Sequence, residues 1–85
     1  MAVHLQISEQ VKKHRHAQQQ FRELDAKREQ AIEYALAEAK AGQAINVIEI
    51  NRITNEMNQI ATRFHFPVRK TVTIDMVKDV IQRSK

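Results

Sequence analysis

The sequence has a single glycine, Gly42, and a single proline, Pro67, in 85 residues. Tight turns depend on these two residue types, because glycine tolerates positive φ angles and proline fixes its own φ. Good helix formers, namely Ala, Gln, Glu, Lys and Arg, are abundant instead. The chain is therefore expected to form a few long helices with few turns between them, within one domain at most.

The first predicted helix covers residues 9–41, because nothing in that stretch breaks a helix. Gly42 follows as the left-handed residue that commonly ends one. Such a helix would be about 50 Å long, which is longer than a compact domain of this size is wide. It must therefore protrude from the domain or pair with another helix.

Residues 1–8 are predicted to be irregular or extended. Ser8 is a candidate N-cap, because its hydroxyl can accept hydrogen bonds from the first backbone N–H groups of a helix. Over residues 3–7, apolar side chains alternate with other residues in the manner of an extended segment, at Val3, Leu5 and Ile7.

One face of the first helix is apolar but is interrupted by polar residues. The face consists of His14, Ala17, Phe21, Leu24, Arg28, Ala31 and Ala35, widened by Ile32, Leu36 and Ala39. Polar residues such as His14 and Arg28 can fix the register of paired helices. Alternatively, Arg28 covers the core with its aliphatic part and keeps its guanidinium in water. We favour the second interpretation.

Three signals mark the start of a second helix over residues 46–64. Asn46 is a favourable N-cap, Glu49 completes a capping box, and Ile45 with Ile50 form a hydrophobic staple. The apolar seam of this helix is expected to be buried and consists of Ile50, Ile53, Met57, Ile60 and Phe64.

A short third helix is predicted over residues 74–83, after an extended segment over 66–72. Thr73 is its N-cap, and Asp75 lies in the first turn, where the helix dipole favours a negative charge. Val72 and Val77 form a staple. The buried face is expected to comprise Val77, Val80 and Ile81.

These elements predict an all-α fold that forms a single domain over residues 1–85. The first two helices form an antiparallel hairpin, and the third helix folds back across it. The surplus length of the first helix favours self-association. The alternative is a compact three-helix monomer in which the first helix is broken or frayed before about residue 17.

Three segments carry a resemblance to a known family. They are L-D-A-K-R-E-Q at 24–30, I-E-I-N-R-I-T-N-E-M-N at 48–58 and T-V-T-I-D-M-V-K at 71–78. Together they resemble the YpbS-like family of short, uncharacterised proteins from Bacillus-type bacteria, and the resemblance covers most of the chain. It implies a bacterial, cytoplasmic protein, but it implies no activity and supplies no site residues.

The sequence predicts no catalytic, cofactor or metal site, and we expect no enzyme. The absence of cysteine excludes thiolate chemistry and disulfides, and one glycine cannot build a phosphate-binding loop. Helical zinc ligands are usually four residues apart, a spacing that is not found among His4, His14, His16 and His65. Glu29 and Glu33 share a face but lack the Glu-x-x-His partners of a bundle metal site.

Charge is segregated along the chain, although the net charge is only +4. Residues 1–22 and 63–85 are basic, whereas 23–62 are acidic. Within the acidic part, Glu23 with Lys27 and Asp25 with Arg28 are expected to form solvated pairs of little energetic value. Cytoplasm is the expected location, and no segment is apolar enough for stable membrane insertion.

The basic clusters are the remaining functional signal. Residues 12–16 form a basic collar around the first helix, and residues 63–70 interleave cations with two phenylalanines. Phe64 fits the seam of the second helix, whereas the role of Phe66 stays open. The residues expected to contact nucleic acid, if the protein binds it, are Lys12, Lys13, Arg15, Arg69 and Lys70.

The helical pattern and the charge distribution favour two functions. The first is a non-enzymatic helical interaction module, homo-oligomeric and able to bind a protein partner. The alternative is a nucleic-acid-binding accessory protein that uses the basic terminal segments. Attachment to an anionic membrane surface ranks last, because the basic part of the first helix lacks a strongly apolar face.

Overall fold

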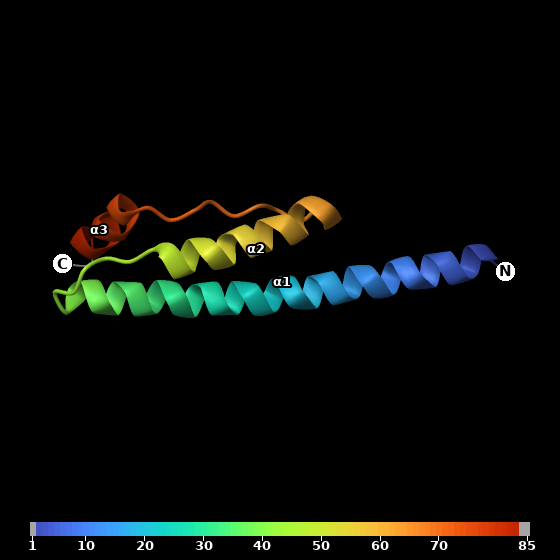
Figure 1. Ribbon diagram of the computed structural model, residues 1–85, viewed down its shortest axis with the longest axis horizontal. Coiled ribbons are helices and arrows are strands. Elements are labelled where there is room, and N and C mark those ends of the chain that lie inside the picture. The colour runs from blue at the N-terminus through green and yellow to red at the C-terminus, as the bar shows by residue number, and fades with distance from the viewer. Residues whose placement is uncertain (1, 84–85) are drawn as a thin grey trace.

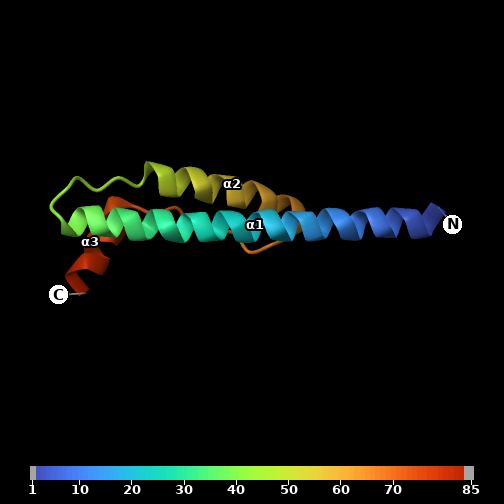
Figure 2. The ribbon, with the colours of Figure 1, turned by 90° about the horizontal axis from the view of Figure 1, so that it is seen from below.

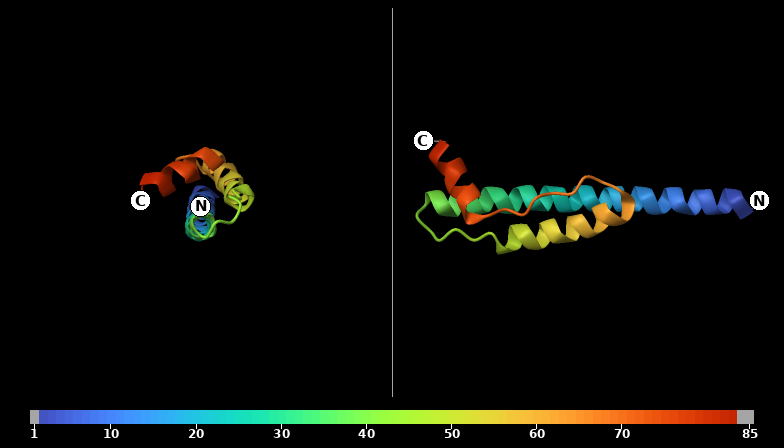
Figure 3. Two further views of the ribbon diagram at one scale, coloured as in Figure 1. Left: turned by 90° about the vertical axis from the view of Figure 1, so that its left-hand side faces the viewer. Right: turned by 90° about the horizontal axis from the view of Figure 1, so that it is seen from above.

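The computed structural model describes the backbone of residues 2–83 and the side chains of residues 8–83. This part of the chain contains three helices, α1 (Ala2–Lys40), α2 (Ile48–Phe64) and α3 (Ile74–Arg83), and no strand. α1 and α2 form a hairpin, and residues 65–73, the return segment, run back along it to α3 (Figures 1 and 3). The molecule measures 62 × 20 × 16 Å. The predicted all-α hairpin is confirmed.

α1 begins at Ala2, so the prediction of an extended segment over 3–7 is wrong. Ser8 lies inside the helix and does not cap it. Three alternating apolar residues are a weak signal, and adding residues to an existing helix avoids the cost of nucleation. α1 is also continuous through residue 17, which contradicts the alternative of a broken first helix (Figure 2).

The end of α1 agrees with the sequence prediction. Gly42 has a φ of 87°, in the left-handed region. Its N–H donates to the Ala39 carbonyl at 3.1 Å, and the Gln43 N–H donates to the Glu38 carbonyl at 2.9 Å. These two bonds form a Schellman motif, which satisfies carbonyls that the helix end would otherwise leave unpaired.

The start of α2 differs from the predicted capping box. Asn46 Oδ1 accepts the Ile48 N–H at 2.9 Å, and the N-cap itself is Val47 without a side-chain cap bond. Glu49 accepts hydrogen bonds from Arg52 instead of reaching back to Asn46. A charged donor one turn ahead competes successfully for this carboxylate, because charge-assisted bonds are the stronger ones.

The seam of α2 is confirmed in its central part. Ile50, Ile53 and Met57 are buried, whereas Ile60 and Phe64 are half-buried. Thr54 and Ala61, which the seam prediction left out, are fully buried. The helix ends at His65, whose φ of 62° is left-handed, and Ala61 accepts the N–H groups of His65 and Phe66.

The return segment is extended, as predicted for 66–72, and two asparagines of α2 bind its backbone (Figure 1). Asn58 accepts the N–H of Arg69 at 2.8 Å and donates to its carbonyl at 2.9 Å. Asn51 does the same with Val72, at 2.7 and 2.9 Å. Seven helical residues and three extended residues both span about 10 Å, so the two pairs match in register.

The core lies where α1, α2, the return segment and α3 meet. Its buried members are Ala35, Ile50, Val72 and Val77, and it is surrounded by Ala31, Ile32, Leu36, Ala39, Ile45, Val47 and Ile81. Ile45 and Ile50 therefore share one cluster, as the staple predicted. Alanines at the contact positions of α1 allow the other elements to approach closely.

α3 has the predicted bounds and cap. Thr73 Oγ1 accepts the Met76 N–H at 3.2 Å, and Val72 and Val77 are both buried. The prediction that Val80 is buried is wrong, because its side chain is 47% exposed. α3 packs on α1 and not on α2, so only a narrow stripe of this short helix is covered.

Membrane-spanning character is absent from the helices described. None of them combines the length with the apolar composition that crossing a bilayer requires.

We predict that Asn51→Ala and Asn58→Ala each lower the free energy of unfolding by about 1–3 kcal/mol, because each leaves two partly buried backbone groups unpaired. Urea denaturation of the full chain measures the loss. Asn55→Ala is the matched control on the same helix, and its exposed side chain predicts a change of at most about 0.5 kcal/mol. Equal effects at all three positions would contradict the role of these asparagines.

Candidate functional site

The structure does not gather the candidate nucleic-acid residues into one patch. Lys12, Lys13 and Arg15 are exposed on the α1 overhang, which we define as residues 2–16, the part of α1 that extends past the end of α2 (Figure 2). Arg69 lies beside Asp25, ten residues beyond Arg15 on α1, or about 15 Å along the helix axis. Arg15 and Arg69 are therefore about 15 Å apart along α1, although His14 of the first basic cluster contacts Phe64 and Phe66 of the second.

Arg69 and Lys70 take part in the fold. The Arg69 Nε atom lies 3.8 Å from Asp25 Oδ1, and its guanidinium carbon lies 5.5 Å from the centroid of the Phe21 ring. This is a cation–π distance, so the charge is already partly compensated. Lys70 is exposed, but its backbone carbonyl accepts a hydrogen bond from Arg28. Asp25 thus pairs with Arg69 and not with Arg28, contrary to the prediction.

His14 and the three phenylalanines form one cluster at the end of α2. The Phe66 ring centroid lies 5.3 Å from those of His14 and Phe21 and 6.1 Å from that of Phe64. These separations are typical of favourable ring pairs. Phe66 therefore ties the return segment to α1, and its half-buried ring is engaged within the fold. Base stacking by Phe64 and Phe66 would compete with these contacts.

Arg28 joins three elements, which the favoured prediction missed. Its Nε donates to Thr54 Oγ1 on α2 at 2.8 Å, and its Nη2 donates to the Lys70 carbonyl at 3.0 Å. Thr54, which is fully buried, donates its own hydroxyl hydrogen to the Ile50 carbonyl at 2.8 Å. The guanidinium therefore does not lie simply in water. It fixes the position of α1 against α2 and the return segment.

The histidines occupy separate environments. His14 belongs to the aromatic cluster, His16 is exposed, and His65 forms the left-handed end of α2. His4 lies outside the described side chains. Within residues 8–83, no three His, Asp or Glu side chains gather in a way that could hold a metal ion.

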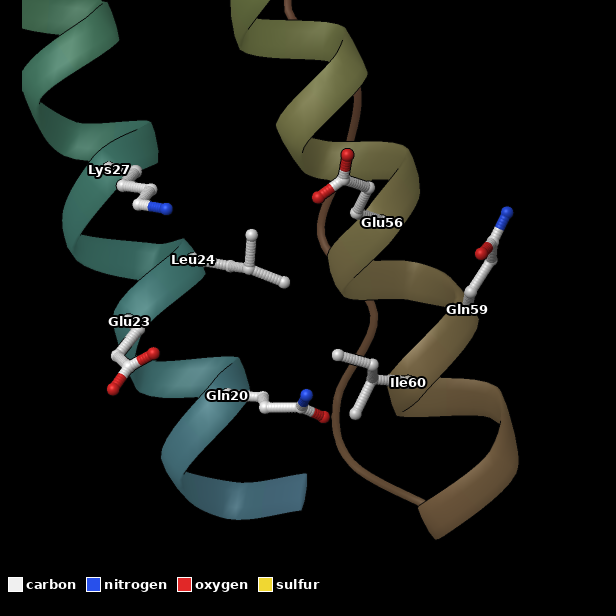
Figure 4. Close-up of a pocket in the computed structure, with 7 residues that line it drawn as sticks. All are labelled: Gln20, Glu23, Leu24, Lys27, Glu56, Gln59 and Ile60. Atoms are coloured by element: carbon white, nitrogen blue, oxygen red, sulfur yellow. The ribbon is translucent and has the colours of Figure 1, made fainter. Parts of the chain in front are cut away.

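A groove runs between α1 and α2. It consists of two hollows of about 310 and 470 Å³ that share Lys27, and Figure 4 shows the smaller one. Its apolar floor comprises Leu24, Ala31, Ala35, Ile50, Ile53 and Ile60. Charged residues line its rim, at Glu23, Lys27, Glu38, Glu49, Arg52 and Glu56. Tyr34 also lines it and is 67% exposed. We call this feature the hairpin groove.

Local partners set the protonation of two groups in the hairpin groove. A hydrogen bond from Arg52 lowers the pKa of Glu49, which keeps this carboxylate charged at neutral pH. A hydrogen bond with the Glu38 carboxylate raises the pKa of the Tyr34 hydroxyl. The ionised Glu49 carboxylate and the protonated Tyr34 phenol therefore line the same hollow.

Glu23 and Lys27 are not paired with each other within the described chain, although i, i+4 spacing predicts it. Figure 4 shows their side chains directed apart, with Leu24 between them on α1 facing Ile60 on α2. Sequence reasoning missed the hairpin groove, because it depends on how closely two helices approach.

Comparison with known proteins gives a family but no activity. A family model described as "Protein of unknown function (DUF2533)" matches residues 1–83. The "Uncharacterized protein YpbS" of Bacillus subtilis (strain 168) is 35% identical over 81 residues, which cover 95% of each chain. No solved structure matches significantly. The predicted resemblance is confirmed over nearly the whole length.

We predict that Thr54→Val lowers the free energy of unfolding by about 1–2 kcal/mol, since it keeps the side-chain shape but leaves Arg28 Nε without its acceptor. Thermal or urea unfolding measures the change. Thr62→Val, at an exposed position of the same helix, is the control and should change stability by at most about 0.5 kcal/mol. A Thr54→Val protein as stable as the control would show that the Arg28 junction contributes little.

Proposed function

The chain belongs to the family of proteins of unknown function DUF2533, and we propose from its geometry that it is a non-enzymatic helical interaction module that forms homo-oligomers. The α1 overhang carries this proposal. Every side chain described within it, from Ser8 to His16, is exposed. Helices in proteins owe most of their stability to packing, and the exposed side chains of this segment receive little of it from the rest of the chain. A second copy would supply that packing.

The polar residues inside the fold support a role without catalysis. Arg28, Thr54, Asn51 and Asn58 use their hydrogen-bonding groups on partners within the chain. Catalysis requires a nucleophile, acid or base directed at a bound substrate. No such group stands out among the described side chains. The lack of cysteine agrees with a cytoplasmic location, which is part of the same proposal.

We predict that the purified protein has a mass above the 9.9 kDa of one chain at high concentration, and that this mass falls toward one chain on dilution. Analytical ultracentrifugation over a wide concentration range measures it. A mass of one chain at every concentration would overturn self-association.

Binding to nucleic acid is the second candidate, and the basic collar of residues 12–16 favours it. All five of these side chains are exposed, although the His14 ring also contacts Phe64 and Phe66. Arg69 contributes less than the sequence suggested, because Asp25 and Phe21 already engage it. The contact set is therefore reduced chiefly to Lys12, Lys13 and Arg15.

If this candidate is correct, the triple variant Lys12→Glu, Lys13→Glu, Arg15→Glu loses binding to duplex DNA or single-stranded RNA in fluorescence anisotropy. Each lost phosphate contact also lowers the slope of log K against log salt by about 0.7–0.9. Lys78→Glu, an exposed charge on α3, is the control and should retain most of the affinity. If the triple variant binds nucleic acid as tightly as the natural chain does, the basic collar is not the binding site.

A further inference from the structure

The hairpin groove is long, straight and open. Its lining on α1 extends from Gln20 to Glu38, which corresponds to about 27 Å along the helix axis. The return segment does not contribute to its lining, because Asn51 and Asn58 bind that segment elsewhere on α2. One side of the hairpin is thus covered by the chain itself, whereas the other holds this groove, in which Leu24, Ala31 and Ile60 are half-buried between charged residues.

The α1 overhang and the hairpin groove carry matching charges on one face of α1. Glu9 and Lys13 lie on the overhang, and Glu23 and Lys27 line the groove. At 3.6 residues per turn, positions 9, 13, 23 and 27 fall within an arc of about 80° around the helix. All four side chains are exposed, and none is in an ion pair within the described chain.

We infer that the hairpin groove binds the α1 overhang of a second copy of this chain, with the two α1 helices antiparallel. Glu9 then faces Lys27 of the partner subunit, and Lys13 faces the partner's Glu23. Both pairs have their midpoint at residue 18, so a single two-fold axis creates each of them twice. This inference rests on the proposed self-association and specifies its site and register.

The lengths agree with this register. A two-fold axis at residue 18 aligns residues 2–16 of one copy with residues 20–34 of the other. The overhang, which the chain's own α2 leaves uncovered, therefore lies over the groove of its partner. The aligned region of α1, residues 2–34, would be about 48 Å long. In one symmetric contact, each overhang therefore lies in the groove of the other copy.

The charges favour this orientation over a parallel one. A parallel pair in register places Glu9 beside Glu9 of the partner subunit and Lys27 beside Lys27 of the partner subunit. Like charges then repel at both positions. In the antiparallel register, residues 2–16, which carry three Lys or Arg residues and one Glu, lie against residues 20–34, which carry four acidic and three basic residues. Charge complementarity of this kind selects orientation and register more than it adds affinity.

Charge reversal tests the register in the full-length protein. Glu9→Lys alone, or Lys27→Glu alone, should weaken the dimer about tenfold to a hundredfold at low salt, because each attraction becomes a repulsion twice per dimer. The double variant Glu9→Lys, Lys27→Glu should recover most of the affinity. Glu33→Lys makes the same charge change at an exposed position outside the groove, and it should change the dissociation constant of the dimer by at most about threefold. Sedimentation equilibrium measures this constant for all four variants.

Cysteine cross-linking provides a second readout, because the natural chain has no cysteine. The double variant Glu9→Cys, Lys27→Cys should form a covalent dimer under mild oxidation. Each single variant should stay uncrosslinked, since its two copies would lie about 27 Å apart in this register. A parallel dimer would instead cross-link both single variants, which would overturn the inference.

The outcomes separate this inference from the proposed function. If the natural chain dimerises but neither reversal weakens it, or the double variant fails to recover, the overhang binds elsewhere and only this inference is overturned. The exposed Val11 face would then be the contact to map. If the natural chain is a monomer at all concentrations, both the proposed function and this inference are overturned.

Discussion

The fold depends on two asparagine side chains that bind an extended backbone to a helix. Asn51 and Asn58 each offer an amide that pairs with both backbone groups of one residue in the return segment, as a neighbouring strand would. An extended segment without such partners would leave its N–H and C=O groups unpaired. With them, the return segment covers one side of the hairpin, and Val72 reaches the core where α3 begins.

That arrangement determines which surfaces remain available. The return segment and α3 lie on one side of the α1 and α2 pair, so the hairpin groove stays open on the other. α2 ends at the aromatic cluster around His14, so the described side chains of the α1 overhang before His14 stay exposed as well. The exposed overhang and the open groove are the two surfaces that a second copy of the chain can cover.

Local signals in the sequence predicted local structure well. The left-handed Gly42, the Thr73 cap and the central seam of α2 depend on residues within one or two turns. Predictions failed where another side chain competes for the same group, either one turn away or far along the chain. Glu49 pairs with Arg52 instead of completing a capping box, and Arg28 reaches Thr54, 26 residues away, instead of solvent.

The sequence by itself determined the number of helices, their approximate bounds and the family, because helix propensity, end signals and family motifs are properties of short segments. Only the tertiary structure decided that Arg69 pairs with Asp25 and that Phe66 joins the aromatic cluster beside His14. These facts depend on which segments lie side by side. That adjacency follows from long-range packing and from the asparagine contacts of α2, which no periodicity within a helix encodes.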